Sequence, residues 1–224
     1  SSIFNFDIKR VKEIFEVGLP AALEQVIFQI GITAFLILVA FYGTEAYAAY
    51  GIGVQILSFS IVIGFGFSIA GATLVGQHLG AKNEEQAKRA GWGAMRLSII
   101  SMTFFGVLIT IFAEPLARYM IDNDEVVRLT VIFIWLLGSM QPLMAIEFSL
   151  GGALRGAGDT KTPLAITLTC LLFIRVFLAM IFFLLDARVE VIFSTLVADY
   201  VVKGFLYVAR FRSDRWMNVL KTRE

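Results

Sequence analysis

Residues 46–79 read AYAAYGIGVQILSFSIVIGFGFSIAGATLVGQHL and contain no aspartate, glutamate, lysine or arginine. A helix needs about 20 consecutive apolar residues to cross the hydrocarbon core of a bilayer. This segment is longer than that, so we expect a tilted or protruding transmembrane helix. Together with five further long apolar stretches, the candidate spans are residues 14–41, 46–79, 92–113, 126–152, 162–185 and 189–210. The sequence therefore predicts an all-α membrane protein built as a six-transmembrane-helix bundle.

The overall composition agrees with a protein embedded in a lipid bilayer. Of the 224 residues 58% are hydrophobic and 17% are charged, with a mean hydropathy of +0.80. Soluble domains have about 45–50% apolar and about 25% charged residues, so a disordered chain is excluded and a soluble enzyme is disfavoured. The net charge of +1 provides no field for nucleic acid. Cys170 is the single cysteine, so an internal disulfide is excluded and a cysteine-based zinc site is disfavoured.

Sequence motifs for enzymatic chemistry are missing. The glycine-rich segment GGALRGAGDT lacks the Gly-Lys-Ser/Thr of a phosphate-binding loop, and neither GxSxG nor HExxH occurs. We therefore expect no enzymatic activity and no cofactor.

The distribution of basic residues predicts how the bundle is oriented. Thirteen of the 19 lysines and arginines fall in the N-terminal arm, the second and fourth loops and the tail, whereas the other loops hold two, Arg118 and Arg188. Basic loops stay on the cytoplasmic side of the membrane. We expect both termini to be cytoplasmic and the protein to lie in the plasma membrane.

Three regions are predicted along the chain: an arm over 1–13, a transmembrane lobe over 14–210 and a basic cytoplasmic tail over 211–224. In the arm, Ile8, Val11 and Phe15 recur at helical spacing between charged residues. This pattern fits a helix lying along the inner membrane surface. It equally fits the first turns of the first transmembrane helix. Within the lobe, Pro20 and Pro142 are candidate kink points, because each removes a backbone hydrogen bond.

Charged groups within a transmembrane helix are costly, by about 2.5–3.5 kcal/mol each on insertion scales, so each needs a physical reason. Glu24 lies one turn after Pro20, with Gln25 and Gln29 nearby. A carboxylate with amides beside a kink suits a proton, Na⁺ or an organic cation, because hard cations prefer oxygen ligands. Alternatively, Glu24 reaches water at the headgroups.

Four more ionisable groups lie deeper in the predicted helices. Glu147 follows Pro142 in an apolar run, where it would exchange a proton during transport or pair with Arg175. Arg175 must find a carboxylate or a water-filled cavity. Asp199 and Lys203 are four residues apart on one helix, so we expect a structural ion pair between them.

Three segments resemble the multidrug and toxic compound extrusion (MATE) family: GLPAALEQ (Gly18 to Gln25), AGATLVGQHLGAKNEEQAKRAG (Ala70 to Gly91) and GGALRGAGDTKTP (Gly151 to Pro163). The resemblance covers nearly the whole chain and implies a cation-coupled exporter, in which two six-helix lobes form a V-shaped cleft. It further implies substrates that are small organic cations, coupling to Na⁺ or H⁺, and a lobe similar to the C-terminal one. The other lobe would then belong to the same polypeptide, a partner chain or a second copy.

The resemblance also implies roles for particular residues. Some members carry cation-site carboxylates in the first and fourth helices of this lobe, which points to Glu24 and Glu147 as residues that would hold Na⁺. Arg175 in IRVFLA is similar to the arginine pattern of the family's fifth helix. The Asp159-Thr160 element is shared by both lobes and is expected to be a structural turn and cap.

Two alternative functions remain open at this point. One is a flippase of lipid-linked saccharides from the same superfamily, which would favour a large cationic cavity. The other is a membrane scaffold that transports nothing. A scaffold would bury Glu24 and Glu147 in ion pairs with no accessible cleft, whereas a transporter would leave one of them facing a cavity.

Overall fold

The computed structural model of the protein describes residues 8–219, which are almost entirely helical and contain no strand. Residues 1–7 of the predicted arm and 220–224 of the predicted tail lie outside this range. The helices are α1 (Ile8–Ala40), α2 (Thr44–Gly80), α3 (Glu84–Ile111), α4 (Ala113–Met120), α5 (Asp124–Ser139), α6 (Gln141–Gly156), α7 (Lys161–Thr169), the π-helix η1 (Cys170–Val176), α8 (Phe177–Leu184), α9 (Val189–Arg212) and the 3₁₀ turn η2 (Arg215–Asn218).

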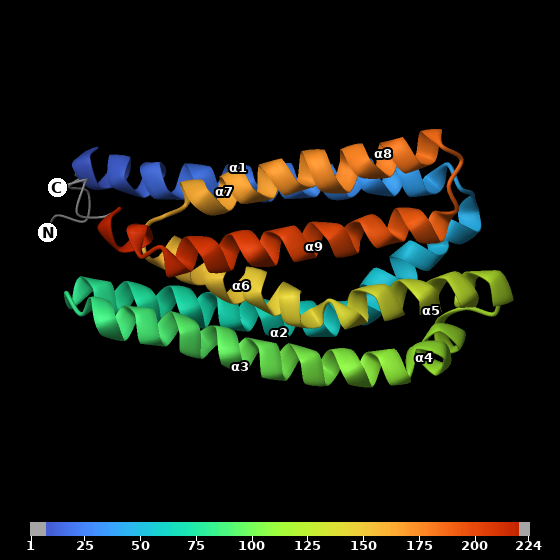
Figure 1. The fold of residues 1–224 in the computed structure, drawn as a ribbon, viewed down its shortest axis with the longest axis horizontal. Coiled ribbons are helices and arrows are strands. Elements are labelled where there is room, and N and C mark those ends of the chain that lie inside the picture. Colours follow the sequence, from blue (N-terminus) through green and yellow to red (C-terminus); the bar gives the residue numbers. More distant parts are fainter. Residues whose placement is uncertain (1–7, 220–224) are drawn as a thin grey trace, which may run out of the picture.

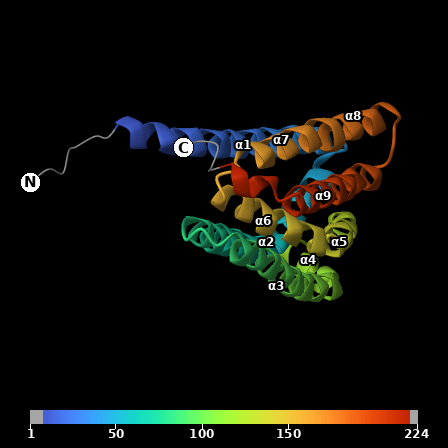
Figure 2. The ribbon, with the colours of Figure 1, turned by 60° about the vertical axis from the view of Figure 1, so that its left-hand side comes forward.

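The helices form a bundle with two outer layers (Figure 1, Figure 2). On one side α1 lies along α7, η1 and α8, and on the other side α2 packs against α3, with α5, α6 and α9 between them. The start of α1, the α2–α3 turn, the α6–α7 link and the end of α9 share one end of the bundle, which we call the basic end. Most of the basic residues counted for the orientation lie on these segments. Their assignment to the cytoplasmic side stays a prediction.

The predicted six spans are present as helices. Five of them, α1, α2, α3, the continuous run Lys161–Leu184 and α9, are each long and apolar enough to cross a membrane. The sixth is the pair α5 and α6, which passes the same test as one bent span. The all-α six-helix membrane fold is therefore confirmed. Residues 8–13 form the first turns of α1, and a location of the arm along the inner membrane surface stays a prediction.

The two candidate proline kinks behave differently. α1 passes through Pro20 as one continuous helix. At Pro142 the fourth span breaks: α5 and α6 meet at Met140 with a bend of 54°. Pro142 occupies the first turn of α6, where its missing N–H is tolerated. Gln141, fully buried at this break, accepts a hydrogen bond from the Ser60 hydroxyl of α2.

Two features of the spans were not anticipated from the sequence. The short helix α4 follows α3 after a single residue, and Arg118 on it forms ion pairs with Glu114 and Asp124. In the fifth span the helix widens to a π-helix over Cys170–Val176, and this segment carries Arg175. π-Helical turns are uncommon and frequently occur at functional sites.

Glycines permit a backbone contact between α2 and α6. A methyl group added at Gly152 would lie 2.1 Å from the Ser68 carbonyl oxygen, and one added at Gly156 would lie 2.1 Å from the Ala72 carbonyl oxygen. These two glycines are four residues apart and face the same partner helix. Small residues at this spacing let helices approach closely within a membrane. Gly152 and Gly156 therefore let α6 lie directly against the backbone of α2.

Side-chain hydrogen bonds connect the segments at the basic end. Asp159 in the α6–α7 link accepts from the Thr162 hydroxyl at 2.8 Å and from the Thr162 backbone N–H at 3.3 Å. Its second oxygen accepts from Arg210 of α9, at 2.9 Å from Nε and 2.6 Å from Nη2. The expected structural turn and cap at Asp159 is therefore present.

The first part of the predicted tail is packed onto the bundle. Trp216 is fully buried, stacks on Phe211 and donates its indole N–H to the Phe211 carbonyl at 2.8 Å. Trp92 of α3 contacts Phe211 edge-on, and Lys88 lies 2.6 Å from the Asp214 carboxylate. Phe211 and Asp214 are therefore held against α3, and Trp216 packs on Phe211.

Replacing Gly152 with alanine tests the α2–α6 contact. The added methyl group meets backbone atoms, which cannot rotate away, so we expect Gly152→Ala to destabilise the protein by about 1–3 kcal/mol. Thermal unfolding in detergent measures this as a lower midpoint. The matched control is Gly93→Ala, whose methyl group would have nothing within 4 Å. Equal midpoints for the two variants would contradict the proposed backbone contact.

Candidate functional site: a charged cavity inside the bundle

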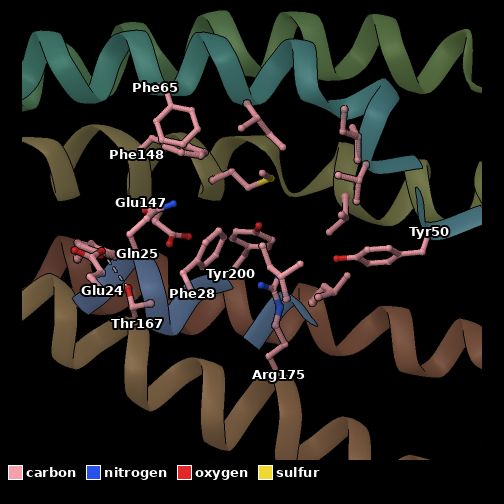
Figure 3. A pocket seen from close by; sticks show the side chains of 18 of the residues that line it. Glu24, Gln25, Phe28, Tyr50, Phe65, Glu147, Phe148, Thr167, Arg175 and Tyr200 are labelled. Carbon is pink, nitrogen blue, oxygen red and sulfur yellow. Dashed lines mark hydrogen bonds between the residues drawn. The ribbon is translucent and has the colours of Figure 1, made fainter. Parts of the chain in front are cut away.

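A cavity of about 230 Å³ lies inside the bundle, bounded by α1, α2, α5, α6, α7, η1 and α9 (Figure 3). Its wall is mostly apolar and aromatic, with Phe28, Ile32, Val54, Leu57, Ile61, Phe65, Phe133, Leu137, Met144, Phe148 and Leu196. The polar lining consists of Glu24, Gln25, Tyr50, Glu147, Arg155, Thr167, Arg175, Tyr200 and Tyr207. An apolar cavity with a few converging polar groups is the usual form of a small-molecule site.

Glu24 on α1 is the centre of a polar cluster at one end of the cavity. Arg155 near the end of α6 donates through Nη1 to both carboxylate oxygens, at 3.0 and 3.1 Å. The Thr167 hydroxyl of α7 donates to Glu24 at 3.3 Å, and Arg155 Nη2 donates to the Ser68 hydroxyl of α2 at 3.3 Å. The cluster thus connects four helices, and both charged side chains keep some exposure to the cavity.

A second group of charges lies deeper, between α6, η1 and α9. Lys203 Nζ lies 3.2 Å from Asp199 Oδ2 and 3.3 Å from Glu147 Oε1. Arg175 Nε lies 3.7 Å from Asp199 Oδ2. We call these four residues the charge quartet. Its formal charges cancel, which is how ionisable groups persist inside a membrane. The separations exceed the about 2.7–2.9 Å of a charge-assisted hydrogen bond, so the partners form ion pairs without short hydrogen bonds between them.

Aromatic rings surround the two cations of the charge quartet. Lys203 Nζ lies 5.7 Å from the centre of the Phe28 ring and 5.6 Å from that of Tyr200. Arg175 lies 6.0 Å from the Phe35 ring and 5.8 Å from the Tyr200 ring. Within about 6 Å the face of a ring attracts a cation. Tyr200 is therefore shared between both cations.

The structure places the predicted site residues as follows. Glu24, Gln25, Glu147 and Arg175 all line the cavity, but the exposed Gln29 is not part of its lining. Asp199 and Lys203 adjoin each other as their spacing predicts, and both are fully buried behind the cavity wall.

Within the described residues, Glu147 does not form the alternative ion pair with Arg175. The acid partner of Arg175 is Asp199, and Glu147 lies against Lys203. The test between scaffold and transporter gives a mixed result, because Glu24 and Glu147 are both paired and both line a cavity.

Arg155 and Thr167 are site residues that the sequence reasoning missed. Arg155 was counted as a loop cation, but it lies on α6 eight residues after Glu147. Eight residues are slightly more than two helical turns, so the two side chains share a face. That spacing was the available signal for Arg155. For Thr167, which contacts Glu24 only through helix packing, the sequence offers none.

Few side chains that could bind a metal ion lie close together in the described part of the chain. The described residues contain no group of three or more histidine, cysteine, aspartate or glutamate side chains that could hold a metal. Glu24 and Glu147 each face a basic side chain instead. A Na⁺ ion at either carboxylate would therefore compete with Arg155 or Lys203.

Comparison with known sequences shows a clear relationship. A model of the MatE family matches residues 20–181. The chain is 32% identical over 214 residues to a probable multidrug resistance protein NorM of Thermotoga maritima, covering 92% of this chain and 44% of that protein. It is 30% identical over 152 residues to the multidrug resistance protein NorM of Aliivibrio fischeri, covering 67% of this chain and 33% of that protein.

Solved structures share the fold. The MATE transporter ClbM in complex with Rb⁺ superposes with a TM-score of 0.87 at 21% identity, over 95% of this chain and 50% of that one. A MATE family transporter of the MOP superfamily in an outward-facing conformation gives 0.80 at 21% identity, over 92% and 46%. The chain therefore spans about half the length of the relatives it matches.

The Glu24–Arg155 contact can be tested by a double-mutant cycle. Arg155→Met leaves the Glu24 carboxylate without its cation, so we expect a loss of about 1–3 kcal/mol in stability. Adding Glu24→Gln should recover part of that loss, because the unpaired charge is gone. Thermal unfolding gives the measurement, and Arg89→Met, which breaks an exposed pair with Glu85, is the control with little effect. Strictly additive losses in the double variant would show that the two side chains do not interact.

Proposed function

The chain belongs to the MatE family, and we propose that it forms one lobe of a multidrug efflux transporter that exports small organic cations. In this proposal Na⁺ or H⁺ moves inward in exchange, and the transporter alternates between two states that open to opposite sides of the plasma membrane. A second six-helix lobe completes the transporter, because alternating access in such folds moves one bundle against another around a site near the membrane centre.

The observation that carries this proposal is the position of Glu147. Its carboxylate lines a cavity with aromatic walls and lies seven residues after Met140, where the same span bends by 54°. Beyond it, Gly152 and Gly156 hold the far end of α6 against α2. Glu147 therefore lies between a break in the helix and a fixed contact. A change in the angle between α5 and α6 would therefore alter the surroundings of a cation bound at Glu147.

Coupling requires that the ion binds the two states with different affinity. If Glu147 faces the cavity in one state and the other three members of the charge quartet in the second state, its affinity for a cation differs between the two states. The aromatic lining, including Phe28 and Tyr200, suits the organic cation, since ring faces attract ammonium groups. Glu24, held by Arg155 and Thr167, supplies a second carboxylate to the same cavity.

The charge of the cavity disfavours the flippase alternative. Glu24 and Glu147 balance Arg155 and Arg175 along its wall. A lipid-linked saccharide carries a pyrophosphate group, which would favour an excess of cations. The aromatic wall and the balanced charge fit a cationic substrate better.

Replacing Glu147 by glutamine tests the proposal. Glu147→Gln keeps the shape of the side chain and removes its charge, and Lys203 retains Asp199 at 3.2 Å. We expect the complete transporter to insert and fold, but to lose export driven by an ion gradient by about ten-fold or more. Transport of radiolabelled tetraphenylphosphonium into proteoliposomes measures this, with imposed Na⁺ and H⁺ gradients in separate arms.

The matched control is Glu85→Gln, which removes an exposed carboxylate outside the cavity and should leave export unchanged. Export by Glu147→Gln at the wild-type rate under both gradients would contradict the assignment of Glu147.

A further inference from the structure

The ammonium group of Lys203 occupies a cage made for a cation. Two carboxylates, Asp199 and Glu147, lie at 3.2 and 3.3 Å from Nζ, and the rings of Phe28 and Tyr200 lie at 5.7 and 5.6 Å. Carboxylates and ring faces are the groups that proteins use to hold an ammonium ion. The chain's own side chain therefore fills a position that an external monovalent cation would suit.

The cage has an open and a closed side. Glu147, Phe28 and Tyr200 line the cavity, and Figure 3 shows them grouped together along its wall. Asp199 and Lys203 are fully buried behind them. A cation in the cavity can therefore reach Glu147 from the front, whereas Lys203 reaches the same carboxylate from behind.

Lys203 forms ion pairs with two carboxylates but no hydrogen bond to either. Neither its Nζ nor either carboxylate oxygen of Asp199 has a hydrogen-bond partner within the described part of the chain. A lysine side chain has a flexible four-carbon stem with a compact charge at its end. A small shift toward Asp199 would therefore release Glu147 without leaving the ammonium group unpaired.

We propose that Lys203 is a tethered competitor for the cation site of the cavity. When a monovalent cation from the cavity binds Glu147, the Lys203 ammonium group withdraws to Asp199, and it returns when that cation leaves. This inference rests on the proposed function, because it takes Glu147 as the carboxylate that binds the transported or coupling cation.

Competition from Lys203 would make release of the bound cation from Glu147 fast. The charge quartet is formally neutral wherever the Lys203 ammonium lies, but Glu147 has a basic partner only while Lys203 contacts it. A bare Glu147 would bind a cation tightly, and conduction through a membrane protein requires binding weak enough to let the ion leave. The returning ammonium group replaces the departing cation at Glu147, so neither step leaves that carboxylate unpaired.

Two substitutions should shift cation affinity in opposite directions. Lys203→Met removes the competitor, so a cation should bind about ten-fold more tightly or better, as expected for removing a like charge near the site. Asp199→Asn removes the alternative partner, so Lys203 stays on Glu147 and the cation should bind more weakly than in the wild type. The matched control Lys88→Met removes a lysine paired with Asp214, away from the cavity.

The experiment is a titration of the complete transporter in detergent with sodium chloride or with tetramethylammonium chloride, at constant ionic strength. The shift in thermal midpoint reports the affinity. A shift with sodium alone identifies the coupling ion as the competing cation, and a shift with tetramethylammonium alone identifies a substrate ammonium group. Tighter binding in Lys203→Met and weaker binding in Asp199→Asn, with either cation, supports the proposal.

Unchanged or weaker binding of both cations in a folded Lys203→Met variant would overturn the inference. If Lys203→Met does not fold, the decision passes to Asp199→Asn, and affinity equal to wild type in a folded Asp199→Asn variant overturns it. The proposed function fails separately, if Glu147→Gln still exports at the wild-type rate. In a further outcome, Glu147→Gln loses export while Lys203→Met and Asp199→Asn do not shift cation affinity in opposite directions. That result would leave the proposed function standing and would contradict only the role of Lys203 as a competitor.

Discussion

The attraction between Lys203 and two carboxylates is the constraint on which the interior of this lobe depends. Each isolated charge at the centre of a bilayer would cost about 2.5–3.5 kcal/mol or more. The charge quartet removes most of that cost, because its formal charges cancel and its contacts span three helical segments, α6, η1 and α9. Removing Lys203 would leave the Glu147 carboxylate without its basic partner, and a buried charge left unpaired is typically far more destabilising than the pair is stabilising.

The surrounding fold holds this group of charges in place while leaving part of it accessible. Gly152 and Gly156 fix one end of α6 on α2, and the break at Met140 separates the other end from α5. The π-helical segment carries Arg175 to Asp199. Glu147 is the acidic member that reaches both the buried charges and the cavity. Structural stability and the proposed exchange of cations thus act on the same carboxylate.

Much of the architecture was predictable, because crossing a membrane imposes strong rules on sequence. The apolar stretches identified six spans, and Pro142 marked the bend in the fourth span. The spacing of Asp199 and Lys203 predicted their proximity. These features depend on local sequence and helix geometry alone.

The partners of the charges were harder to predict, because they depend on how each helix is rotated about its axis. Glu147 and Arg175 looked complementary, yet the packing sets Lys203 against Glu147 and Asp199 against Arg175. The Arg155 contact to Glu24 joins residues 131 positions apart. The π-helix over Cys170–Val176 was equally hard to predict, because its sequence contains no proline or glycine that would mark it.

The central claim is that Glu147 is the carboxylate whose partner changes when a cation enters the cavity. Difference infrared spectroscopy of the complete transporter tests it most directly, by recording carboxylate stretching bands with and without the bound cation. The account predicts a cation-induced carboxylate band that persists in Glu24→Gln and disappears in Glu147→Gln. A band that persists unchanged in Glu147→Gln would contradict it.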